Sequence, residues 1–111
     1  MRNKKEVLLV MEYFEGFTLE TVMKERFFQS EKFEGGEIRH IINSLLGAIS
    51  YIHSLNIIHR DIKPDNIIVP LDLDYTKLKL CDFGLCTIAD GPIVEKVEGS
   101  AIYMAPELIM R

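Results

Sequence analysis

Residues 57–66 read IIHRDIKPDN, and this stretch decides how the rest of the chain is interpreted. Two apolar residues are followed by eight that are mostly charged or polar, with a proline among them. A single loop aspartate usually caps a turn or faces solvent, so Asp61 alone would carry little information. The crowding of Asp61, Lys63 and Asn66 into one short loop indicates a chemical role.

The bulk composition excludes several classes of protein. The chain has 111 residues, enough for one small domain or part of a larger one. With 48% hydrophobic and 27% charged residues it is not expected to be disordered, and its net charge of −4 gives no support to nucleic-acid binding. Its apolar runs are far shorter than the about 20 residues of a membrane span. Cys81 and Cys86 are interpreted as reduced thiols, which favours an intracellular, cytoplasmic protein.

Two helices are expected in the first half of the chain. Apolar residues at helical spacing predict a helix from Leu19 to about Phe28, with Thr18 as its N-cap. Residues 38–55 keep an apolar stripe and predict a longer helix, which Asn56 ends because asparagine tolerates the left-handed conformation. Gly35 and Gly36 are expected to break the chain between the two helices.

Strands are expected on either side of these helices. Residues 7–11 form a continuous apolar run and predict a strand buried on both faces. Residues 67–69 and 77–81 predict a hairpin joined by a long loop. Residues 82–107 lose periodicity and predict a long, functional loop, after which another helix begins. The fold class is therefore α+β.

Phosphoryl transfer explains the charged cluster best. That reaction needs a carboxylate near the attacking hydroxyl, a cation on the transferred phosphate, and oxygen ligands for Mg²⁺. Asp61, Lys63 and Asn66 supply these groups from one loop, and Asp82 supplies a second carboxylate after the hairpin.

Three motifs in this order, HRDIKPDN at 59–66, DFG at 82–84 and APE at 105–107, resemble those of a eukaryotic-type protein kinase domain. The resemblance implies part of a bilobal α+β fold and a serine/threonine kinase that uses ATP and Mg²⁺ on protein Ser and Thr hydroxyls. The ending GSAIYMAPE and the long hairpin loop resemble the calcium/calmodulin-regulated group. The implied segments are the last small-lobe strand and hinge (1–17), two large-lobe helices (18–55), the catalytic loop and hairpin (56–81) and the activation segment (82–107).

The resemblance also implies a role for each matching residue. Asp61 would be the catalytic base, and Lys63 would steady the γ-phosphate and point to Ser/Thr substrates. Asn66 and Asp82 would bind Mg²⁺. The adenine of ATP would be bound by the gatekeeper, hinge and floor positions, here Met11, Glu12, Phe14 and Ile68.

Other matching positions belong to the activation segment and its contacts, namely Arg60, Phe83, Gly84, Ser100 and Glu107, with His59 and Phe83 in the hydrophobic spine that joins the lobes. No Ser, Thr or Tyr stands between Thr87 and Ser100, so the usual phosphorylation site is missing. Glu95 or Glu98 is hypothesised to replace the phosphate and pair with Arg60, the alternative being two solvated loop charges.

Several parts of the family pattern are not found before Val7: the glycine-rich loop, the strand lysine and the control helix. The isolated chain is therefore expected to be inactive, and poorly folded because residues 38–55 would expose part of their stripe. A second hypothesis remains open, in which the chain is an inactive interaction module that docks a complementary kinase lobe.

Overall fold

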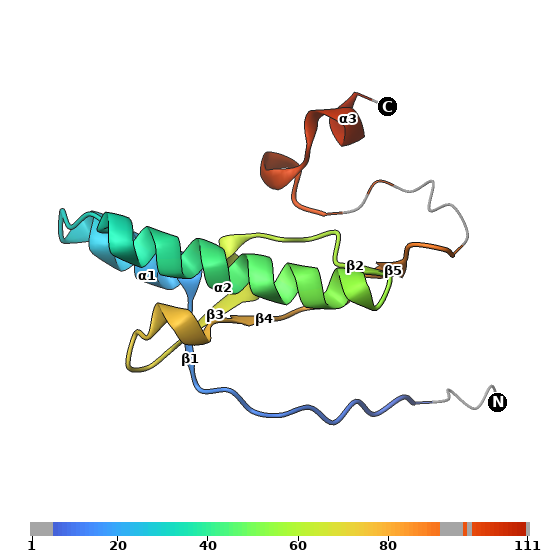
Figure 1. The fold of residues 1–111 in the computed structure, drawn as a ribbon, viewed down its shortest axis with the longest axis horizontal. Coiled ribbons are helices and arrows are strands. Elements are labelled where there is room, and N and C mark those ends of the chain that lie inside the picture. The colour runs from blue at the N-terminus through green and yellow to red at the C-terminus, as the bar shows by residue number, and fades with distance from the viewer. Residues whose placement is uncertain (1–5, 92–96, 98, 111) are drawn as a thin grey trace.

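The computed structural model describes residues 6–91, 97 and 99–110, and it combines helices with small antiparallel sheets (Figure 1). The two long helices are α1 (Leu19–Phe28) and α2 (Gly35–Ser54). One sheet has the strand order β1 (Gly16–Thr18), β3 (Ile67–Pro70) and β4 (Lys79–Leu80), and a second pairs β2 (Ile57–Ile58) with β5 (Thr87–Ile88). Short helical turns complete the described elements: η1 (Pro64–Asn66), η2 (Tyr75–Lys77), η3 (Ala101–Tyr103) and α3 (Pro106–Ile109).

Helix α1 has the predicted bounds. The Thr18 side chain accepts a hydrogen bond from the Thr21 N–H at 3.1 Å, which satisfies one of the free donors of the first turn. Leu19 and Val22, on the inward face of the helix, are buried. The predicted cap is confirmed. The predicted apolar face is confirmed only for Leu19 and Val22, because Met23 is 44% and Phe27 79% exposed.

Helix α2 begins earlier than predicted, and the predicted break at Gly35 and Gly36 is wrong. Both glycines lie in the first turn of α2, where the Glu34 N–H donates to the Glu37 carboxylate at 2.8 Å and fixes the helix start. At the other end Asn56 has a φ of 58°, so the predicted left-handed stop is confirmed.

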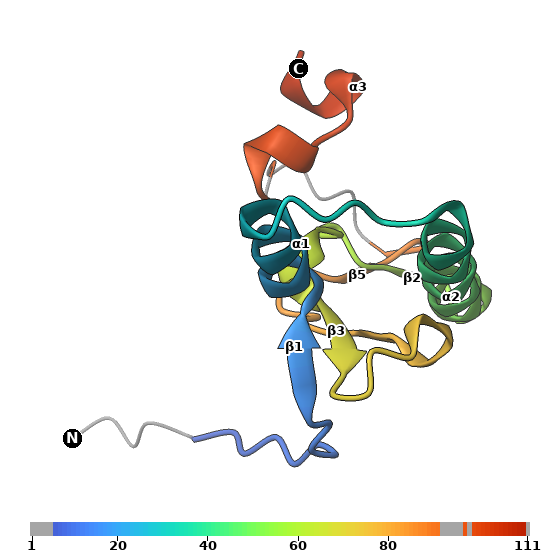
Figure 2. The ribbon, with the colours of Figure 1, turned by 90° about the vertical axis from the view of Figure 1, so that its left-hand side faces the viewer.

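The predicted strand at residues 7–11 does not form. These residues are 74–93% exposed, and none of them pairs with another described segment. Figures 1 and 2 show this part of the chain running away from the helices and sheets. A strand is stabilised by hydrogen bonds to a neighbour, and the apolar run alone does not supply one.

The predicted hairpin is confirmed, with Ile67 opposite Leu80 in an antiparallel register. Its second strand begins at Lys79, later than predicted, because residues 75–77 form the η2 turn. Asp74 caps this turn, and hydrogen bonds from Thr76 together with the Lys77 ammonium lower the pKa of Asp74 to about 2.

The small core lies where α1, β3 and η2 meet, and it is formed by Leu19, Val22, Ile67, Val69 and Tyr75. Helix α2 contributes Ile41 and Leu45 from one side, while Ile38, Ile42 and Leu46 remain about half exposed on the other. Figure 2 shows α1 and α2 on opposite sides of β3, and the loop that follows β2 leads to η1, which packs against α1. The core therefore supports one end of that loop.

Candidate active site

His59 fixes the start of the charged loop. Its side chain is 1% exposed, its Nδ1 accepts from the Asp61 N–H at 3.1 Å, and its Nε2 lies 2.9 Å from the Cys81 carbonyl oxygen. Because a backbone N–H donates and a carbonyl accepts, the ring must carry its proton on Nε2. His59 thereby joins the backbone of Asp61 to the end of the hairpin.

Asn66 fixes the other end of the loop and orients the Asp61 side chain. The Asn66 amide nitrogen donates to the Asp61 carbonyl at 2.8 Å and to Asp61 Oδ2 at 3.1 Å. The backbone of Asn66 is held in turn, since its N–H donates to the Lys63 carbonyl and its carbonyl accepts from the Cys81 N–H. Both bonds to Asp61 use the amide nitrogen, so the Oδ1 atom of Asn66 remains able to bind a cation.

Lys63 and Ser100 complete a cluster around the Asp61 carboxylate. The Lys63 ammonium donates to the Ser100 hydroxyl at 2.8 Å and lies 3.8 Å from Asp61 Oδ2. The Ser100 hydroxyl lies 3.5 Å from Asp61 Oδ1. The structure thus brings together a carboxylate, a cation and a hydroxyl from two segments far apart in the sequence.

Gly99 is a residue of this cluster that sequence reasoning missed. Its φ is +124°, a conformation that favours glycine, and a Cβ atom there would lie 3.0 Å from the Arg60 carbonyl oxygen. The close approach lets Ser100 reach Lys63. The only signal in the sequence was a glycine directly before a predicted site residue.

Asp82 is positioned near this cluster by the preceding residue, Cys81. The Cys81 N–H donates to the Asn66 carbonyl, and the Cys81 carbonyl accepts from the His59 ring. Asp82 has a left-handed φ of 59°, and its Oδ1 accepts from the Gly84 N–H at 3.2 Å. Burial raises the pKa of the Cys81 thiol, and the Asp82 carboxylate adds to the effect. The Cys81 thiol is therefore protonated at neutral pH and is a poor nucleophile.

The ring of Phe83 meets the ring of His59 edge to face, with 4.9 Å between their centroids. The two predicted spine residues are therefore in contact. This contact links the segment after Asp82 to the start of the charged loop.

The donor atoms present fit a Mg²⁺ ion that is shared with phosphate. Asn66 offers an amide oxygen and Asp82 a carboxylate, which are the hard oxygen ligands that Mg²⁺ prefers. Within the described ranges no group of three or more His, Cys, Asp or Glu could hold a metal ion. A Mg²⁺ ion here would therefore take its remaining ligands from water and nucleotide phosphates.

A cavity of about 160 Å³ opens beside Asp61. It lies between the charged loop and the segment that leads into α3, so a substrate group placed in it would be next to the Asp61 carboxylate. Its lining residues are Arg60, Asp61, Ile62, Ser100, Tyr103, Met104, Ala105 and Leu108.

The residues predicted to control the activation segment are only partly brought together. Arg60 has a left-handed φ of 72°, and its guanidinium donates to the Leu85 carbonyl at 3.4 Å. Glu95 and Glu98, its hypothesised partners, lie outside the described residues. Glu107 is exposed in the first turn of α3.

The predicted adenine-binding residues are also partly assembled. The Lys79 ammonium pairs with the Glu12 carboxylate and lies 5.1 Å from the Phe14 ring centroid. Ile68 is opposite Lys79 in the sheet register, so Glu12 and Phe14 lie near the strand that carries Ile68. Met11 is 75% exposed.

No helix in the described part of the chain is long and apolar enough to span a membrane. The family model described as protein kinase domain matches residues 1–111. The serine/threonine-protein kinase DCLK1 of Rattus norvegicus is 45% identical over 105 residues, which cover 94% of this chain and 23% of that protein. The human calcium/calmodulin-dependent protein kinase type 1B is 38% identical over 107 residues, covering 96% of this chain and 30% of that protein. Mouse DCLK2 is 40% identical over 110 residues, 98% of this chain and 14% of that protein. The chain therefore spans less than a third of each of these relatives.

Proposed function

This chain belongs to the protein kinase domain family, as its motifs predict, and from this premise we propose that it is the central part of a serine/threonine protein kinase. The proposed reaction transfers the γ-phosphate of ATP to Ser or Thr hydroxyls of proteins. The observation that carries the proposal is the cluster in which Asn66, Lys63 and Ser100 surround the Asp61 carboxylate.

In the proposed mechanism Asp61 accepts the proton that the substrate hydroxyl loses. Its carboxylate is suited to this because the Asn66 amide fixes its orientation and the side chain is only 11% exposed. The Lys63 ammonium stabilises the negative charge that develops on the transferred phosphoryl group. Lys63 at this position also supports Ser and Thr as the acceptor residues.

Asn66 and Asp82 are proposed to bind Mg²⁺ with ATP. A Mg²⁺ ion held by these two residues would supply positive charge that offsets the charge of the nucleotide phosphates. The contribution of this chain is to hold Asn66, at the end of η1, near Asp82, which follows β4. The Cys81 N–H donates to the Asn66 carbonyl, and the Cys81 carbonyl accepts from His59.

The nucleotide base is proposed to bind near β3, between the backbone of Glu12 and Phe14 and the side chain of Ile68. The support is the Lys79 contact to Glu12, which brings residues 12–14 to this strand. Met11 would complete the site only if residues 7–11 paired with a further strand. We also propose an intracellular, cytoplasmic location, which the proposed use of ATP and the free thiols of Cys81 and Cys86 support.

Asp61→Asn in the full-length protein tests the proposed reaction. The substitution keeps the shape of the side chain and its place beside Asn66 but removes the proton acceptor, so kcat should fall roughly 10²- to 10⁴-fold. The measurement is transfer of labelled γ-phosphate to a protein substrate. Asp72→Asn, in the exposed hairpin loop, is the matched control and should keep kcat. Equal activity of the two variants would exclude Asp61 as the base.

The exposed face of α2 favours a second candidate function, an inactive module that docks a complementary kinase lobe. Ile38, Ile42 and Leu46 are 47–57% exposed on this face. A Mg²⁺-dependent rise in the Tm of the full-length protein on adding ATP separates the candidates, because a module without nucleotide chemistry should show none.

A further inference from the structure

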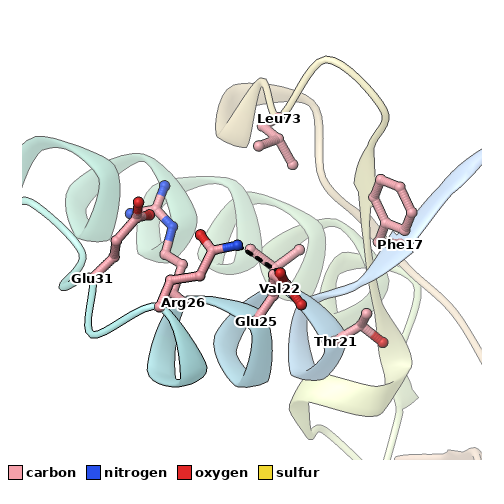
Figure 3. A pocket seen from close by; sticks show the side chains of 8 residues that line it. Phe17, Thr21, Val22, Glu25, Arg26, Glu31 and Leu73 are labelled. Atoms are coloured by element: carbon pink, nitrogen blue, oxygen red, sulfur yellow. Dashed lines mark hydrogen bonds between the residues drawn. The ribbon is translucent and has the colours of Figure 1, made fainter.

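A larger cavity, of about 390 Å³, lies beside α1 (Figure 3). It is bounded by α1, by β1 and by the loop that follows β3. None of its lining residues belongs to the cluster around Asp61 or to the proposed adenine site. Its volume falls within the range of about 300–1,000 Å³ that is usual for binding pockets. The proposed kinase reaction leaves this cavity without a role.

The walls of the cavity are apolar. Figure 3 shows Phe17 on β1 and Leu73 in the hairpin loop at one side, and Val22 on α1 at the other. Phe17 is 46% and Leu73 41% exposed, so both present apolar surface to a ligand. Leu73 is held in a left-handed conformation, with a φ of 56°, by the bond from its N–H to the Pro70 carbonyl at 2.9 Å.

The rim of the cavity is acidic. Glu25 and Glu31 both line it, and the nearby cation, Arg26, is already paired. The Arg26 guanidinium donates to both Glu37 carboxylate oxygens, at 2.6 and 2.7 Å, and to the Tyr75 hydroxyl at 3.1 Å. Arg26 also interacts electrostatically with Glu31, and Glu25 accepts a hydrogen bond from Gln29 at 2.6 Å. One cation is therefore set against three carboxylates, those of Glu25, Glu31 and Glu37, which leaves a net negative charge at the opening.

We propose that this cavity binds a peptide segment of a partner protein that carries one large apolar side chain between basic residues. The apolar side chain would enter between Phe17, Val22 and Leu73. The flanking Lys or Arg residues would pair with Glu25 and Glu31, which stand six positions apart at and just beyond the end of α1. Two separated carboxylates fit cations on two different residues of a peptide.

The test uses fluorescence anisotropy of the full-length protein with a short labelled peptide in which two arginines flank one leucine. Binding should weaken about 10-fold or more when serine replaces the leucine, because burial of a leucine side chain is worth about 1.5–3 kcal/mol. The double change Glu25→Gln and Glu31→Gln should weaken it about 2- to 30-fold, from two partly exposed ion pairs. Added salt should reduce the difference between that variant and the unmodified protein.

Two control variants locate the binding. Glu20→Gln removes a carboxylate that lies on the same helix but outside the cavity, and it should leave the affinity unchanged. Asp65→Asn changes a residue of the charged loop and should also leave it unchanged. Absence of binding, equal affinity for the leucine and serine peptides, or loss of affinity only in Asp65→Asn would overturn the proposal. These readouts need no phosphate transfer, so failure of the kinase proposal would not alter them.

Discussion

At the scale of single residues, the position of Ser100 depends on the absence of a side chain at Gly99. The left-handed φ of Gly99 disfavours any other residue, and a Cβ there would make a tight contact of 3.0 Å with the Arg60 carbonyl oxygen. Ser100 follows directly and receives the hydrogen bond from the Lys63 ammonium. A side chain at position 99 would therefore displace Ser100 from the Asp61 cluster.

Gly99→Ala should lower activity more than stability. The strain of a left-handed alanine is of the order of 1–3 kcal/mol, and the displaced Ser100 would disturb Lys63 and Asp61. In the full-length protein we expect kcat to fall roughly 10- to 100-fold, since small misplacements of reacting groups can cost that much. Gly47→Ala is the matched control, because a Cβ at Gly47 meets nothing within 4 Å inside α2. That control should keep kcat and raise stability by about 0.5–1 kcal/mol; a similar kcat for both variants would contradict the argument.

At the scale of elements, an ion pair fastens α1 to α2. Arg26, near the end of α1, forms a bidentate pair with Glu37 in the first turn of α2 and lies 4.3 Å over the Phe33 ring. The hydrogen bonds from Arg26 lower the pKa of Glu37, and the Glu34 N–H adds to the shift. Burial raises the pKa of the Tyr75 hydroxyl, which accepts from the same guanidinium.

The stability supplied by Glu37 should depend on pH. Folding lowers the pKa of Glu37, so the ionised carboxylate stabilises the folded state at pH values above the unfolded-state pKa of 4.5. This stabilisation is lost as the pH falls through the pKa of the folded state. Glu37→Gln in the full-length protein should therefore cost about 1–3 kcal/mol at pH 7 and less at a pH below the unfolded pKa of 4.5, such as about pH 3. Urea unfolding at both pH values measures this. Glu15→Gln, at an exposed position outside any described ion pair, is the control; an equal cost at both pH values would refute the linkage.

The helix ends that depend on nearby residues could be predicted from the sequence. The Thr18 cap and the spacing of apolar residues placed α1, and Asn56 placed the end of α2. The strand predicted at residues 7–11 was wrong because a strand needs hydrogen bonds to a neighbouring strand, and an apolar composition does not provide them. The pairing of β2 with β5 joins residues about thirty positions apart, and two-residue strands carry no periodicity to reveal it.

The candidate site also has a part that the sequence predicts and a part that it does not. Asp61, Lys63 and Asn66 share one loop, so their proximity follows from the sequence alone. Ser100 was expected near Asp61 only by family resemblance, and the need for glycine at position 99 became visible only with the backbone of Arg60 beside it. Contacts between distant segments depend on the path of the chain, which local patterns do not encode.

At the scale of the whole molecule, the chain exposes far more surface than a compact domain. Its accessible area is 9099 Å², whereas a folded monomer of 12.8 kDa has about 6,300 Å². The excess includes the apolar run at 7–11 and the outer face of α2. At about 25 cal/mol per Å², each 200 Å² of apolar surface left in water forgoes about 5 kcal/mol. That equals the whole stability of a marginal domain.

The 111-residue chain made by itself should therefore lack a cooperative thermal transition and should associate through the face of α2. Scanning calorimetry and light scattering of the isolated chain measure the two effects. The double variant Ile42→Glu and Leu46→Glu should help the isolated chain but harm the full-length protein. Charges on this face should reduce association of the isolated chain, yet they should lower Tm in the full-length protein if further helices cover the face there. A single cooperative transition of the monomeric isolated chain would show that the small core around Val69 and Tyr75 suffices for folding.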